Sequence, residues 1–133
     1  MGQQQLLLIV LGVIIVGIAV AVGIQMFASS ASQANFDAVV ADLQKISSDA
    51  QGWYRKPTSL GGGGRTFATI TLAAVGAPSS NTNGSYSITG TPSATTFTVE
   101  GVGVEDGDGD GTMVTVSLAV YADSVGTLTV TSR

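Results

Sequence analysis

The stretch EDGDGDGT, residues 105–112, contains the one residue pattern in this sequence that suggests a chemical site. Asp106, Asp108 and Asp110 reproduce D-x-D-x-D-G, the opening of a calcium-binding loop in which alternate carboxylates converge on one hard cation. The twelfth position of such a loop would be Ser117, which lacks the bidentate carboxylate expected there. A solvated hairpin turn, rich in Asp and Gly as turns are, is the alternative. The sequence therefore requires no cofactor, and Ca²⁺ is the ion for which it offers a candidate site.

The composition argues against most other chemistry. There is no cysteine and no histidine, which excludes disulfides, thiolate metal sites, cysteine nucleophiles and histidine bases. The acidic stretch has no candidate nucleophile or base beside it, so we do not expect an enzyme. The formal net charge is −4, and the five basic residues form no evident patch: Lys45, Arg55, Lys56, Arg65 and Arg133. Nucleic acid, which needs clustered Lys and Arg, is therefore not an expected partner.

The amino-terminal segment is the most distinctive element of the chain. Every residue from Leu6 to Ile24 is apolar, no lysine or arginine flanks the run, and the first charge is Asp37. As a helix the run would extend about 28 Å, close to the ~30 Å hydrocarbon core of a bilayer. A surface helix of a globular protein would show polar residues on one side. We therefore expect the segment to lie in a bilayer, in a core made only of helices, or in each at different times.

The missing basic flank needs an explanation, because secretory signal peptides and membrane anchors both carry positive charge there. The simplest is that a short basic leader has been removed, which makes Met1 the mature amino terminus and places Gln5 fifth. Within the run, Gly12, Gly17 and Gly23 would let copies of the helix pack closely and unwind locally. A monomeric anchor with ordinary membrane glycines is the alternative. The expected assembly core consists of Leu6, Leu7, Leu8, Ile9, Val10, Ile14, Ile15, Ile18 and Val22.

A second helical pattern follows a short polar passage. From Phe36 to Trp53 apolar residues recur at i, i+3, i+4 and i+7, which predicts one apolar stripe along a helix. Pro57 ends the pattern, and no proline lies between Met1 and Arg55. The two halves are therefore expected to form one helix of about fifty residues, ~75 Å long.

The rest of the chain predicts β-strands. Alternating or nearly alternating polar and apolar residues occupy 85–89, 96–105, 112–122 and 126–132. Their short connections indicate an antiparallel meander. Leu128 and Val130 are expected to face inward. The alternation changes at Gly101, which suggests a bulge there. Residues 65–76 fit either a strand or a short helix. The expected core between helix and sheet consists of Phe36, Val40, Leu43, Ile46, Trp53, Val116, Leu118 and Leu128.

Together these patterns predict an α+β fold, with a long amino-terminal helix packed on an antiparallel sheet of about four strands. Residues 1–27 would form an apolar half-helix for a filament core or a membrane, and residues 28–56 the amphipathic half. Residues 57–133 would form the sheet domain. Residues 28–133 are then expected to fold as one globular head.

This combination of an uncharged apolar helix, an amphipathic continuation and an antiparallel sheet resembles a type IV pilin, with its residue-level support in residues 1–27. The resemblance implies that a prepilin peptidase removes a basic leader and that the new amino terminus is methylated. It also implies that the helix waits in the cytoplasmic membrane before the pilus assembly machinery adds the subunit to an extracellular filament of identical copies.

Two features depart from the pilin pattern. The resemblance would place the docking of neighbouring subunits at Met1 and Gln5. Gln5, however, stands where the family usually has a glutamate thought to neutralise a neighbour's terminal amine. Glutamine can hydrogen-bond an amine but cannot cancel its charge. The disulfide that closes the carboxy-terminal loop in many bacterial pilins is missing. Strand pairing, or a cation in the acidic loop, would have to hold that end instead.

The leading interpretation is the major structural subunit of a cell-surface filament, with the apolar helices bundled in its core and the sheets on its surface. A pseudopilin of a secretion system, which builds a short periplasmic piston, has the same architecture and is the first alternative. A monomeric membrane-tethered binding domain is the second. It would keep a basic flank and would not need an unbroken long helix.

Overall fold

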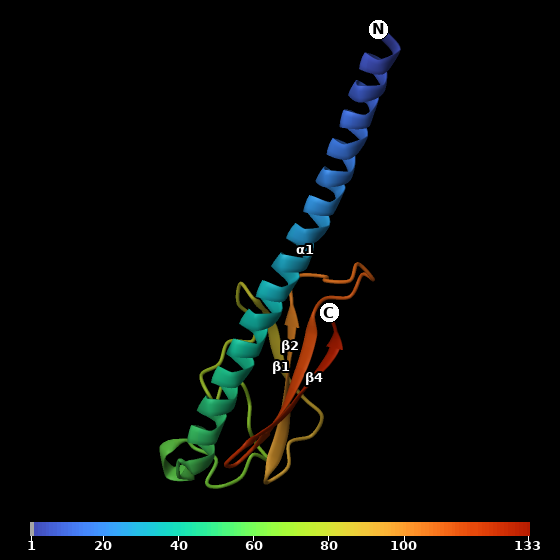
Figure 1. Ribbon diagram of the computed structural model, residues 1–133. Coiled ribbons are helices and arrows are strands. Elements are labelled where there is room, and N and C mark those ends of the chain that lie inside the picture. The colour runs from blue at the N-terminus through green and yellow to red at the C-terminus, as the bar shows by residue number, and fades with distance from the viewer. Residues whose placement is uncertain (1) are drawn as a thin grey trace.

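A computed structural model describes residues 2–133, so the docking role expected for Met1 lies outside the described residues. One helix, α1 (Gly2–Arg55), runs without interruption (Figure 1). A 3₁₀ turn, η1 (Thr58–Leu60), follows Pro57. The strands are β1 (Gly84–Thr89), β2 (Thr96–Gly103), β3 (Thr115–Tyr121) and β4 (Val125–Ser132). The prediction of one continuous helix that ends before Pro57 is confirmed.

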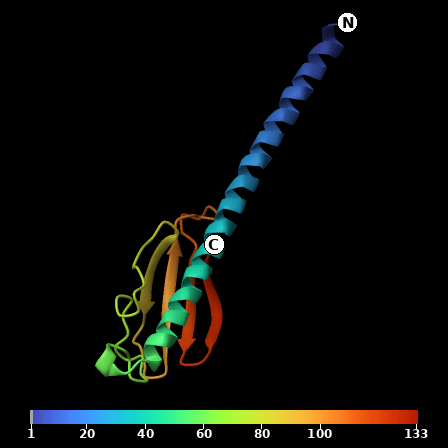
Figure 2. The ribbon, with the colours of Figure 1, turned by 90° about the vertical axis from the view of Figure 1, so that its left-hand side faces the viewer.

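The strands form one antiparallel sheet in the order β1-β2-β3-β4. The predicted meander and the α+β fold are therefore confirmed, and the second half of α1 crosses one face of the sheet (Figure 2). Residues 65–76, which fit either a strand or a helix by pattern, form turns instead. They still complete the core, because the Phe67 ring packs between Tyr54 of α1 and Phe97 of β2, at centroid distances of 4.7 and 5.0 Å.

One apolar core lies between the sheet and α1, which packs on β2 and β3. The predicted core residues that are buried are Leu43, Ile46, Trp53, Val116 and Leu118. Those that are only partly buried, at the margin of the core, are Phe36, Val40 and Leu128. Val130 pairs with Val116 across β3 and β4 but remains 40% exposed, because it lies on an edge strand beyond the cover of the helix. Val130 thus lies on the inner face of the sheet, as predicted, but outside the buried core.

The alternation along β2 does not change, so the bulge predicted at Gly101 is also wrong. Four alternate positions, ending in Gly101 and Gly103, face the helix, and the pairing of β2 with both neighbours is continuous there. The reason is the closeness of α1. A Cβ on Gly101 would lie 2.7 Å from Cγ1 of Val39, and one on Gly103 would lie 2.1 Å from Oδ1 of Asn35. Glycine occupies the inward positions because the helix leaves no room for a side chain.

Polar side chains of α1 form hydrogen bonds to both ends of the sheet. The Asn35 side chain donates from Nδ2 to the carbonyl of Asn83 (2.8 Å) and accepts from the backbone N–H of Val104 (3.0 Å). At the other end, Nε2 of Gln51 donates to two carbonyl oxygens of the β3–β4 turn, each at 3.1 Å. These bonds fix how far along the helix the sheet can lie.

We expect Gly103→Ala to lower the free energy of unfolding by about 1–3 kcal/mol, because the new methyl group would displace Asn35 from its hydrogen bonds. Gly52→Ala is the matched control. Gly52 lies in the part of α1 that belongs to the head, and a Cβ there would meet no atom within 4 Å. This change should therefore leave the free energy of unfolding unchanged or raise it by up to about 1 kcal/mol. Thermal unfolding of the detergent-solubilised chain measures both, and equal effects of the two variants would contradict the close packing of α1 on β2.

Candidate functional site

The first half of α1 is a bare apolar helix that projects from the head (Figure 1). The large apolar side chains between Leu6 and Phe27 are between 49% exposed, at Val22, and 82% exposed, at Phe27. Every residue of the predicted assembly core belongs to this exposed set: Leu6, Leu7, Leu8, Ile9, Val10, Ile14, Ile15, Ile18 and Val22. The structure therefore brings these residues together as one continuous surface that no other part of residues 2–133 covers.

This surface is far larger than the apolar patches that monomeric proteins expose to water. By length and composition the segment is able to cross a membrane. Because it is apolar on all sides, it presents side chains for packing in every direction around its axis. Two shallow apolar depressions lie along it, one lined by Gln3, Leu6, Leu7 and Val10, the other by Gly23, Met26, Phe27, Ser30 and Ala31.

The glycines predicted to permit close packing lie on this surface. A Cβ on Gly12, Gly17 or Gly23 would meet no atom of the chain within 4 Å, so nothing inside the subunit requires glycine there. The helix continues through all three. Local unwinding at these positions was predicted for the packed helix and stays a prediction. Gln5 is exposed on the same helix near its amino-terminal end.

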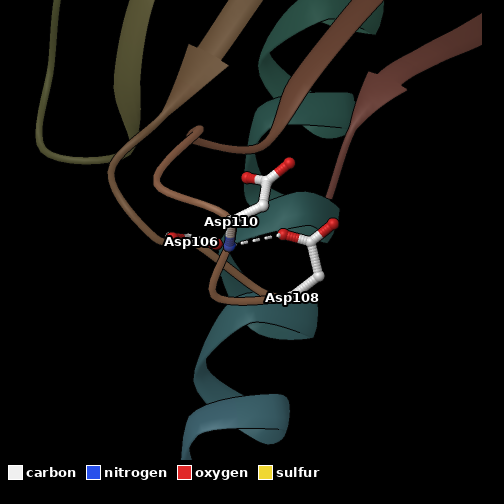
Figure 3. A group of neighbouring side chains, drawn as sticks. All are labelled: Asp106, Asp108 and Asp110. Atoms are coloured by element: carbon white, nitrogen blue, oxygen red, sulfur yellow. Dashed lines mark hydrogen bonds between the residues drawn. The ribbon is translucent and has the colours of Figure 1, made fainter.

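The acidic stretch forms a tight turn between β2 and β3 (Figure 3). The Asp106 carboxylate accepts from the N–H groups of Gly109 (2.7 Å) and Gly111 (2.8 Å). The Asp110 carboxylate accepts from the backbone N–H (2.8 Å) and the hydroxyl of Thr112. Asp108 accepts a longer bond, 3.3 Å, from the N–H of Asp110. The turn is thus stabilised by its own carboxylates.

These bonds favour the ionised carboxylates. The N–H groups of Gly111 and Gly109 lower the pKa of Asp106, and the hydroxyl and N–H of Thr112 lower the pKa of Asp110. One oxygen from each of the three aspartates lies within 4.8 Å of the others, so they are able to converge on one cation, as the sequence predicted. Ser117, the twelfth position of the calcium-loop pattern, lies in β3 paired with Glu100 and does not reach the turn.

The acidic turn lies where α1 leaves the head. The backbone of Gly107 touches the helix: a Cβ there would be 2.2 Å from Oγ of Ser32. The N–H of Asp108 donates to the carbonyl of Arg133 (3.1 Å), which brings the carboxy terminus to the same place. The Arg133 guanidinium lies over the Phe36 ring, 5.1 Å from its centroid. Negative charge is therefore concentrated at the end of the head from which the apolar helix projects.

Basic residues gather at the opposite end, which the sequence analysis missed. The chain reverses after Pro57, and the N–H of Arg65 donates to the carbonyl of Tyr54 (2.8 Å). This contact brings Arg65 beside Arg55 and Lys56 at the end of α1, and all three are exposed. The sequence analysis did not place Arg65 next to this end of α1, which it reaches because the run of glycines at 61–64 folds the loop back on the helix.

A second polar cluster surrounds Asp42, in the second half of α1. Its Oδ2 accepts from Nδ2 of Asn81 and of Asn83, both at 2.8 Å, and from the hydroxyl of Tyr86 at 2.5 Å. Burial raises the pKa of the carboxyl, but the bonds from Asn83, Tyr86 and Asn81 outweigh it, so the pKa lies below its ordinary value. Burial and the Asp42 carboxylate raise the pKa of Tyr86. The cluster ties β1 to the helix, and its donors lie too far along the chain for any local pattern to show it.

No match is found among protein-family models, curated proteins or solved structures. The geometry of the chain therefore carries the functional argument.

We expect Asp42→Asn to reduce the loss of stability in acid. The pKa of Asp42 is lower in the folded chain than its unfolded value of about 4, so the carboxylate stabilises the fold above that pH, and the stabilisation disappears as the pH falls through the folded pKa. Far-UV circular dichroism of thermal unfolding between pH 7 and 2 measures the difference. Asp49→Asn, which removes only a surface pair with Lys45, is the control. Identical pH profiles for the two variants would contradict the role of Asp42.

A calcium site in the acidic turn predicts that millimolar Ca²⁺ raises the unfolding temperature of the full chain relative to chelator, and that Asp108→Asn removes the rise. Asp108 is the appropriate position because Asp106 and Asp110 also hold the turn together. Mg²⁺ at the same concentration is the control, since it requires a more rigid octahedral site. An unfolding temperature that does not respond to Ca²⁺ would favour the solvated turn.

Proposed function

We propose that this protein is a structural subunit of a type IV pilus-like filament on the cell surface, assembled by packing of the apolar halves of α1. The observation that carries the proposal is one unbroken helix with two different halves. Its first half is apolar on all sides and exposed, and its second half packs on the sheet to form the core of a compact head. One element thereby joins an assembly surface to a water-exposed domain.

The unbroken helix supports a filament over a simple tether. A tethered domain needs only a membrane span and a linker, and a linker permits movement between the two. Here α1 continues from the apolar half through Ala28–Ala31 into the buried stripe without a break. The head is thus fixed in orientation relative to the apolar half, which a regular array of identical subunits requires and an independent anchored domain does not.

In this proposal the partners are other copies of the chain, the pilus assembly machinery and a prepilin peptidase that exposes the amino terminus. The cytoplasmic membrane holds the unassembled pool, because Leu6–Ile24 matches the thickness of its hydrocarbon core. Neither an enzymatic activity nor a nucleic-acid partner forms part of the proposal. A pseudopilin would use the same helix, and the place of assembly distinguishes it from a pilin.

Electron cryo-microscopy of material sheared from cells that express the chain tests this function. Thin filaments with a core of bundled helices would support the pilin function, and the residue at which their density begins would locate the processing site. Membrane-bound monomer without filaments would favour a tethered domain. Filaments found only when the secretion machinery is overproduced would favour a pseudopilin.

We expect Gly17→Leu to abolish filaments while the chain remains in the membrane fraction. The change raises the hydropathy of the run and so preserves insertion, but it places a bulky side chain where close helix packing is proposed. Val20→Leu, a small change on the same apolar half, is the matched control and should leave filaments intact. Filament yield by negative-stain microscopy and membrane content by fractionation are the two readouts. Normal filaments from Gly17→Leu would contradict close packing at this glycine.

A further inference from the structure

The head carries opposite charge at its two ends. Four carboxylates and the chain terminus lie at the end where α1 leaves the head, in the segment from Glu105 to Asp110 and at Arg133. Arg55, Lys56 and Arg65 lie at the far end, around the last turn of α1. The two ends are separated by the stretch of helix from Ser32 to Arg55, which spans about 35 Å at 1.5 Å per residue.

Each end also holds one charge of the opposite sign: the Arg133 guanidinium at the acidic end, and Asp123 of the β3–β4 turn, which Gln51 holds near the basic end. Neither charge forms an ion pair with the others at its end in the described part of the chain. Among residues 2–133 the one ion pair is that between Lys45 and Asp49, in the middle of the helix. Each end also exposes large apolar side chains. Leu60, in the turn between Lys56 and Arg65, is 65% exposed. Val104 and Met113, which flank the acidic turn, are 53% and 42% exposed. Both ends therefore expose apolar side chains that a partner would cover, with charged side chains in the position of a rim around them.

We propose that the basic end of one head, Arg55, Lys56, Arg65 and Leu60, docks on the acidic end of the next copy, Glu105, Asp106, Asp108 and Asp110 with Val104 and Met113. This inference rests on the proposed filament and adds which surfaces of neighbouring heads meet. A polymer whose helices all point the same way needs two different patches on each subunit, and the two ends provide them. Contact between like ends is opposed by repulsion, which sets the polarity of the assembly.

A second copy fits the basic end better than a lipid surface does. The apolar half of α1 emerges from the acidic end, so a bilayer that holds this half lies about 35 Å from Lys56 and Arg65. A copy displaced along the helix axis by the length of one head brings its basic end to the acidic turn of its neighbour. The charge pattern therefore favours longitudinal stacking of heads alongside the packing of the apolar helices.

Cysteine crosslinking tests the contact directly, because the chain has no cysteine of its own. In Lys56→Cys/Asp108→Cys the two thiols of one chain lie at opposite ends of the head, beyond the ~7 Å limit for a disulfide, so any disulfide joins two copies. Oxidation of sheared filaments should give a ladder of dimers, trimers and longer multimers on denaturing gels. Either single variant should give dimers at most. Lys45→Cys/Asp108→Cys, with its first thiol moved about 16 Å along the helix, is the matched control and should give no ladder.

Charge reversal provides a second, independent readout. Lys56→Glu/Arg65→Glu should lower filament yield on the order of tenfold, and adding Glu105→Lys/Asp108→Lys should restore it to within about twofold of wild type. Circular dichroism of each variant checks that its head is folded. Two outcomes would overturn the docking contact and leave the filament function intact. In the first, the wild-type chain forms filaments but Lys56→Cys/Asp108→Cys gives no more multimers than the Lys45→Cys control. In the second, charge reversal at the basic end does not lower filament yield, or reversal at the acidic end does not restore it. The absence of filaments from the wild-type chain would overturn the filament function, and the contact with it.

Discussion

Between Ser32 and Trp53, α1 lies so close to the sheet that two inward positions of β2 have no space for a side chain. Gly101 and Gly103 let Val39 and Asn35 approach the strand backbone, and the hydrogen bonds of Asn35 then hold the strand ends in place. Glycine in a strand interior costs stability, and this cost is offset by the apolar contact it permits. The position of the helix on β2 and β3 in turn decides where the acidic turn, the polar cluster at Asp42 and the basic end lie.

The same helix must satisfy two environments. One side of its second half is buried by its own sheet, while its first half has no cover in the part of the chain that the structure describes. The head cannot supply one, because α1 is straight through the junction and carries the apolar half away from the sheet (Figure 1). The cost of exposing such a surface to water is therefore met only by a bilayer or by other helices. The fold of the head and the need of the apolar half for cover are linked, because both depend on one continuous helix.

Charge in this head is arranged by end. The acidic turn and the carboxy terminus lie where the apolar helix begins, and the basic residues lie where α1 stops. Three of the five basic residues lie at the basic end and four of the nine acidic residues lie in the acidic turn, which gives the Ser- and Thr-rich head a directional surface. Apolar packing of the helices would supply most of the free energy of assembly in such a subunit, since desolvated charge adds less to affinity than to direction and register.

The sequence by itself determined the elements and their exposure. The absence of proline before Arg55, the apolar run and the stripe from Phe36 to Trp53 predict one long helix with two characters, because helix periodicity and hydropathy are local properties. Alternation likewise predicts the four strands and their antiparallel order. The convergence of Asp106, Asp108 and Asp110 was also predictable, since the three lie within one turn.

Only the tertiary structure decided which inward positions are filled by side chains and which charges become neighbours. Gly101 and Gly103 look like a break in alternation until α1 is placed over them. The Asp42 cluster joins residues about forty positions apart, and Arg65 meets Arg55 and Lys56 only because the glycine loop folds back. These features depend on contacts between residues that are far apart in the sequence. Which of these residues meet is decided by how the helix, the sheet and the loops pack, and not by their spacing along the chain.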